Sequence, residues 1–79
     1  ERDNKRSEAA DMFLAYHREF QDDVEAPKAL FNAANNKFRI GKMDEAVSAL
    51  RIILAQYPTS NLTANSLYLI ASSFDAVGD

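Results

Sequence analysis

Apolar positions recur along the chain with the spacing of helices. In the first third, one apolar stripe repeats at intervals of four, three and four residues: Ala9, Phe13, Tyr16 and Phe20. Charged residues fall between them, on the opposite side: Glu8, Asp11, Arg18 and Glu19. This is the period of an amphipathic helix, which we predict over residues 7–20. The six residues before Ser7 are almost all charged, and we expect them to be solvated or frayed.

Polar residues and a glycine mark the limits of a second helix, predicted over residues 24–40. Asp22 or Asp23 should accept hydrogen bonds from its free backbone amides, and Glu25 should add negative charge in its first turn. Pro27 is compatible with a position near the start, where no amide hydrogen is needed. Gly41 is predicted to end the helix with a positive φ, which residues with a Cβ resist.

The same signals predict a third helix over residues 43–56 and a fourth over residues 61–77. Asp44 and Glu45 place negative charge where the third helix begins. Pro58 follows its end, and Thr59 or Ser60 is expected to cap the fourth helix. Gly78 is expected to end that helix, as Gly41 ends the second.

Two overlapping copies of one pattern become visible when the chain is shifted by 37 residues against itself. Five pairs coincide: Ala9 with Ala46, Phe13 with Leu50, Leu30 with Leu67, Ala34 with Ala71, and Gly41 with Gly78. Repetition at this length is typical of helical solenoids and not of closed bundles.

The spacing in residues 30–58 resembles the tetratricopeptide-repeat signature, W-x2-L-G-x2-Y, then A-x3-F, then P. The positions that carry the resemblance are Leu30, Ala33, Ala34, Ala46, Leu50 and Pro58. Lys37 stands where the signature has tyrosine, which is a departure. The resemblance covers nearly all of residues 7–79. It implies an all-α, right-handed superhelical solenoid fragment of about four helices in antiparallel pairs, with one full repeat at residues 27–60 between two half repeats.

The longer repeat, with Tyr57, Pro58 and Ser60 between helices, looks like the variant of bacterial envelope proteins. Examples of that variant are the assembly lipoprotein of the Bam complex and the periplasmic coordinator of the Tol-Pal system. This resemblance implies a periplasmic or outer-membrane-associated location, with the cytoplasm as the alternative.

Composition limits the classes of function. The 79 residues allow one small domain, and without cysteine neither a disulfide nor a thiolate metal site can support it. A net charge of −3 argues against nucleic acid as the partner. No apolar run approaches the length of a membrane span. The chain ends where a turn should lead into another helix, so we expect it to be a piece of a longer protein.

Candidate catalytic groups have simpler explanations. The adjacent carboxylates Asp22-Asp23 and Asp44-Glu45 stand at predicted helix starts, where capping accounts for them. His17 is the only histidine, and no cysteine or second histidine is available as a further metal ligand. We therefore predict a protein without catalysis, cofactor or metal.

One polar and aromatic stripe is the candidate binding site. Lys28, Phe31, Asn35 and Arg39 are spaced three, four and four, so they share a face of the second helix. The corresponding residues on the fourth helix are Asn65, Tyr68 and Ser72. The resemblance implies that these positions line a concave groove that contacts peptides. Chaperone-binding members carry lysine at the position of Phe31, so Phe31 argues against chaperone tails. Alternatively, Phe31 and Tyr68 pack against each other between repeats.

The predicted function is a scaffold that binds a segment of a partner protein in this groove. The alternatives are a spacer that contacts only its own chain and a non-catalytic regulatory region of a larger enzyme or signalling protein. The third and fourth helices are also apolar almost all round, since residues 46–79 carry only three of the 21 charges. A helix without a polar face needs cover on both sides, so we expect self-association through the C-terminal helix, by exchange of that helix between copies.

Overall fold

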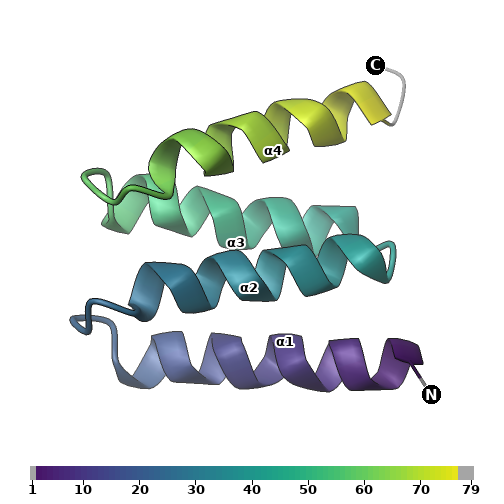
Figure 1. Ribbon diagram of the computed structural model, residues 1–79, viewed down its shortest axis with the longest axis horizontal. Coiled ribbons are helices and arrows are strands. Elements are labelled where there is room, and N and C mark those ends of the chain that lie inside the picture. Colours follow the sequence, from purple (N-terminus) through teal and green to yellow (C-terminus); the bar gives the residue numbers. More distant parts are fainter. Residues whose placement is uncertain (1, 77–79) are drawn as a thin grey trace.

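The protein, seen in a computed structural model that describes residues 2–76, consists of four α-helices. They are α1 (Arg2–Glu19), α2 (Ala26–Arg39), α3 (Met43–Gln56) and α4 (Thr63–Ala76). Each helix packs antiparallel against the next in the order of the sequence, from purple α1 to yellow-green α4 (Figure 1). The predicted all-α fold of antiparallel helix pairs is therefore confirmed.

The helix ends repeat with the same period as the sequence. α1 ends at Glu19 and α3 at Gln56; α2 begins at Ala26 and α4 at Thr63. Both intervals are 37 residues (56 − 19 and 63 − 26). The predicted period is thus a property of the backbone, and α4 is the second copy of α2, as α3 is of α1.

The first helix starts earlier than the sequence suggested. α1 begins at Arg2, so the charged residues that we expected to be solvated or frayed are helical. Three of residues 2–6 are arginine or lysine, which have high intrinsic helix propensity, and such a segment can extend a helix into solvent without any apolar contact.

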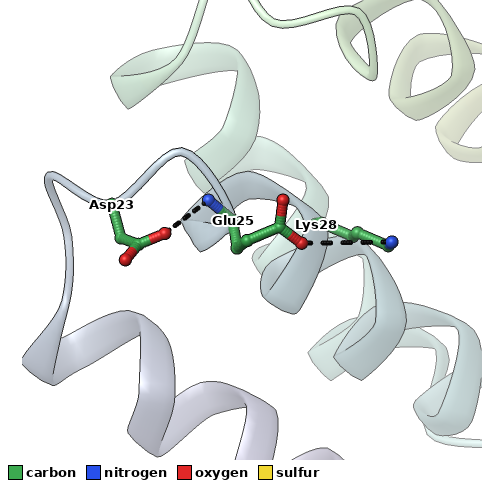
Figure 2. A network of polar contacts seen from close by, with 3 residues as sticks. All are labelled: Asp23, Glu25 and Lys28. Atoms are coloured by element: carbon green, nitrogen blue, oxygen red, sulfur yellow. Dashed lines mark hydrogen bonds and ion pairs between the residues drawn. The ribbon is translucent and has the colours of Figure 1, made fainter.

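The turn between α1 and α2 uses its aspartate differently from the prediction. Asp23 Oδ1 accepts a hydrogen bond from the backbone N–H of Glu25 at 2.8 Å (Figure 2). The N-cap residue is Glu25, and its side chain makes no capping bond. Asp23 therefore orders the turn that leads into α2 and does not cap the helix directly. Pro27 lies in the first turn, as expected.

Gly41 ends α2 as predicted, with φ at +81°. The amide of Lys42 donates to the carbonyl of Lys37 at 2.9 Å, and the amide of Gly41 donates to the carbonyl of Phe38 at 3.1 Å. This pair of bonds is the Schellman arrangement, which satisfies the last carbonyl groups of a helix. Asp44 then lies in the first turn of α3, where we expected acidic charge.

The loop from α3 to α4 is held by short polar bonds. Ser60 Oγ accepts from the backbone N–H of Leu62 at 3.1 Å, and Thr63 Oγ1 donates to the carbonyl of Tyr57 at 3.2 Å. α4 begins at Thr63, two residues after the predicted start, because these turn bonds occupy the residues before it. The predicted end of this helix, Val77 and Gly78, lies outside the described residues.

The core lies between α2 and α3. Its buried members are Leu30, Ala34, Ala46, Ala49, Leu50 and Ile53. Alanines at three of these positions let the two backbones approach closely, and the larger residues fill the remaining space. Leu69 and Ile70 of α4 pack against this cluster from the next layer.

A second set of contacts connects α1 and the turn after it to the end of α3. The buried His17 ring hydrogen-bonds the Gln56 side chain, with 3.2 Å between Nε2 and Oε1. It also meets the Tyr57 ring edge-on at a centroid distance of 5.9 Å. The Tyr57 hydroxyl donates to the carbonyl of Gln21 at 2.7 Å. Burial and the nearby Asp22 raise the pKa of Tyr57, so this hydroxyl remains a donor to higher pH than an ordinary tyrosine. His17 therefore joins α1 to α3.

Candidate protein-binding surface

The predicted stripe on α2 divides into exposed ends and a half-buried middle. Lys28 and Arg39 are exposed, whereas Phe31 and Asn35 are half-buried. Phe31 packs against the α2–α3 core cluster. The middle of the stripe is thus partly shared with the core, and the charged side chains at its ends are exposed to solvent.

The corresponding residues on α4 are more open. Asn65 is exposed and Ser72 is half-buried. Tyr68 is 72% exposed, although its counterpart Phe31 is half-buried. An aromatic ring with this exposure offers a large contact area to another molecule.

Lys28 belongs to a second feature, a pocket of about 510 Å³ between α1 and α2. Its lining residues are Ala9, Met12, Phe13 and Tyr16 from α1, with Glu25, Lys28, Ala29 and Asn32 from α2. Lys28 Nζ lies 4.0 Å from Glu25 Oε1 at its edge, and the pair is drawn in Figure 2. Both side chains are largely exposed, so this ion pair adds little stability.

The pocket was not predicted from the sequence. The stripe Ala9, Phe13, Tyr16 was recognised as the apolar face of a helix. Its spacing alone does not say whether another helix covers that face. Met12, one residue before Phe13, is 72% exposed and adds a flexible apolar side chain to the pocket wall.

Lys37 is a charged residue whose burial was not predicted from the sequence. It is only 5% exposed, and its Nζ lies 2.7 Å from Glu45 Oε1 on α3 and 4.0 Å from Asp11 Oδ1 on α1. A buried ammonium group is stable only when paired. The lysine that replaces the tyrosine of the repeat signature is therefore stabilised in its buried position by carboxylates from two neighbouring helices.

The ion pair predicts a dependence of stability on acid. The hydrogen bond from Lys37, followed by the charge of Lys37, lowers the pKa of Glu45. A lowered pKa in the folded state means that the unfolded chain binds the proton more tightly. The contact therefore stabilises the fold above the ordinary glutamate pKa, and this contribution is lost as the pH falls through the lowered value.

Glu45→Gln should accordingly have a lower melting temperature than the parent chain at neutral pH, with the gap closing in acid. Thermal melts of both proteins across the acidic range measure this gap. Asp44→Asn is the matched control, because it removes a carboxylate from the same first turn of α3. An equal gap with the same pH dependence for Asp44→Asn would assign the effect to the helix dipole instead of Lys37.

The described residues contain no group of three or more histidine, cysteine, aspartate or glutamate side chains able to hold a metal ion. The adjacent acidic residues lie where the fold uses them, Asp23 in a turn and Glu45 in an ion pair. In the part of the chain that the structure describes, no helix has the length and apolar character needed to cross a membrane.

Comparison with protein families finds a tetratricopeptide repeat over residues 28–60. Comparisons with curated proteins and with solved structures gave no match. The matched residues comprise α2 from Lys28 onwards, the Gly41 turn, α3 and the start of the next loop. Repeats of this type commonly mediate contacts between proteins and are typically non-catalytic. The chain therefore contains a tetratricopeptide repeat, and its expected role is interaction with other proteins.

Proposed function

We propose that α2 and α4 form one binding surface for an extended or helical segment of a partner protein, without catalysis. The observation that carries this proposal is the 72% exposure of Tyr68 at the position equivalent to Phe31. Asn35 and Arg39 on α2 and Asn65 and Ser72 on α4 provide polar groups beside these two rings. Exposed aromatic side chains with adjacent hydrogen-bonding groups are typical of peptide contact sites.

The chemistry of this surface fits a polypeptide better than a small anion. The stripe holds two positive charges, Lys28 and Arg39, at its opposite ends. Lys28 already lies near Glu25. A small anion would need converging positive charge, whereas an amide such as Asn35 can pair with the backbone of a bound segment.

A photo-cross-linking residue in place of Tyr68 tests the surface directly in the native host. We expect it to capture a partner protein, while the same residue in place of Arg51, exposed on α3, should not. With that partner, Asn35→Ala and Arg39→Ala should each weaken binding by about fivefold or more, corresponding to about 1 kcal/mol. Their melting curves should stay close to that of the parent protein.

The contrary result is equally specific. If binding is unchanged in both variants and only Phe31→Ala loses stability, the stripe belongs to the packing between repeats. The partner would then dock elsewhere.

A location in the bacterial envelope is a further part of the proposal. It is supported by the loop that carries Tyr57, Pro58 and Ser60. Tyr57 and Ser60 both make hydrogen bonds that shape this loop. Fractionation of cells that produce the full-length protein, with detection in periplasm, membrane and cytoplasm, tests the location.

We also propose that the chain associates with itself through α4. Leu67 is 54% exposed and Phe74 is 46% exposed, and both lie on this helix. Covering apolar side chains of this size is favourable in water. Sedimentation velocity over a range of concentrations should show association, and a monomer at high micromolar concentration would contradict it.

A further inference from the structure

The apolar wall of the pocket on α1 has a covered counterpart in the same molecule. Adding 37 to Ala9, Met12, Phe13 and Tyr16 gives Ala46, Ala49, Leu50 and Ile53. All four of these α3 residues belong to the buried core cluster. The face that α1 presents to the pocket is thus the face by which α3 packs against α2.

The covering helix in that counterpart is α2, through Leu30 and Ala34. Adding 37 to these residues gives Leu67 and Ala71 of α4. Leu30 is fully buried, whereas Leu67 is 54% exposed and Ala71 is also exposed. α4 therefore carries residues equivalent to those with which α2 covers α3. In α4 these residues are exposed to solvent.

We infer that the groove between α1 and α2 binds α4 of a second copy of this chain. In this arrangement Leu67 and Ala71 of one copy lie against Met12 and Phe13 of the next, since their equivalents Leu30, Ala34, Ala49 and Leu50 share one buried cluster within a single copy. The inference rests on the self-association proposed above and adds the second half of the interface.

One ion pair of the covered counterpart has no equivalent in this assignment. Lys37 pairs with Glu45 in the covered counterpart, and the equivalents of these residues are Phe74 and Glu8. α4 thus brings an aromatic ring where α2 brings an ammonium group, so the interface buries no positive charge and Glu8 gains no ion pair from α4. Met12 stands where the counterpart has Ala49, and its flexible thioether can adapt to the helix that covers it.

The interface is heterologous, since one copy contributes α4 and the other contributes the groove. Each bound pair leaves one groove and one α4 open, so further copies can add. Association should therefore extend beyond dimers as the concentration rises.

Two charge substitutions on the 79-residue chain test the inference. Met12→Glu blocks the groove and Leu67→Glu blocks α4, and both positions are exposed enough to accept a charge without loss of the fold. Each variant alone should lose association at least about tenfold by sedimentation. Ser48→Glu, exposed on α3, is the control and should associate like the parent chain.

The decisive measurement mixes the two variants. Met12→Glu keeps an intact α4 and Leu67→Glu keeps an intact groove, so an equimolar mixture should form a dimer that cannot grow. If Leu67→Glu loses association but Met12→Glu does not, and mixing restores nothing, copies meet through α4 alone. Self-association would then stand, and the groove assignment would be overturned.

A parent chain that is monomeric at high micromolar concentration would overturn both this inference and the proposed self-association. Circular dichroism melts of each variant at low concentration separate loss of association from loss of fold.

Discussion

Replacing Leu30 with alanine should lower the free energy of unfolding by about 2–5 kcal/mol, the range for truncating a fully buried leucine. Leu30 has no exposed surface and lies in the α2–α3 core cluster. A chain of this length is expected to have a total stability of about 4–12 kcal/mol, at the usual contribution per residue. Loss of this one side chain would therefore remove a large fraction of the total stability and shift the urea midpoint to a lower concentration.

Leu67→Ala is the matched control for this prediction. It changes the same residue type at the equivalent position of the repeat, but Leu67 is 54% exposed. Its cost should be about 0.5 kcal/mol, as for most surface positions. Urea denaturation at low protein concentration compares the two without a contribution from association. Equal losses would mean that α4 is covered in solution as α2 is.

Helix positions followed closely from the sequence wherever backbone chemistry sets a limit. The predicted range 43–56 for the third helix is that of α3. Gly41 allows a positive φ before it, and Pro58 cannot continue a helix after it. Both limits depend on single residues, so a single sequence contains enough information to find them.

The first and last helices were harder to delimit. Charge before Ser7 suggested a frayed segment, although charged residues with high propensity can extend a helix, as they do from Arg2. The start of α4 depends on turn bonds from Ser60 and Thr63. Such bonds depend on loop geometry, which periodicity does not describe.

The degree to which residues of the candidate surface are buried could not be predicted from spacing alone. Phe31 and Tyr68 occupy equivalent positions, yet one packs on the core and the other is largely exposed. Lysine is usually a surface residue, yet Lys37 is buried. Its ammonium group is paired there with Glu45 and Asp11, which come from two other helices. Contacts of this kind arise only when three helices are assembled. The same reason explains why the pocket on α1 was not predicted.

Gly41→Val should destabilise the fold by about 1–3 kcal/mol, the usual cost of holding a residue with a Cβ in the left-handed region. The φ of Gly41 is +81°, and a Cβ added there would meet no other atom within 4 Å. The expected loss therefore comes from the backbone conformation and not from a clash with neighbours. Relaxing that strain would require a change of φ, which would break the bond from the Lys42 amide to the Lys37 carbonyl.

The same open space makes asparagine the informative comparison for Gly41. Asparagine tolerates the left-handed region better than other residues with a Cβ, whereas valine is among the least tolerant because it is β-branched. Gly41→Asn should thus lose less stability than Gly41→Ala, and Gly41→Val should lose the most. Urea midpoints of the three variants measure this order.

If all three variants had the same midpoint, the strain argument would fail. The α2–α3 turn would then tolerate a negative φ, and the core cluster alone would have to hold α2 against α3.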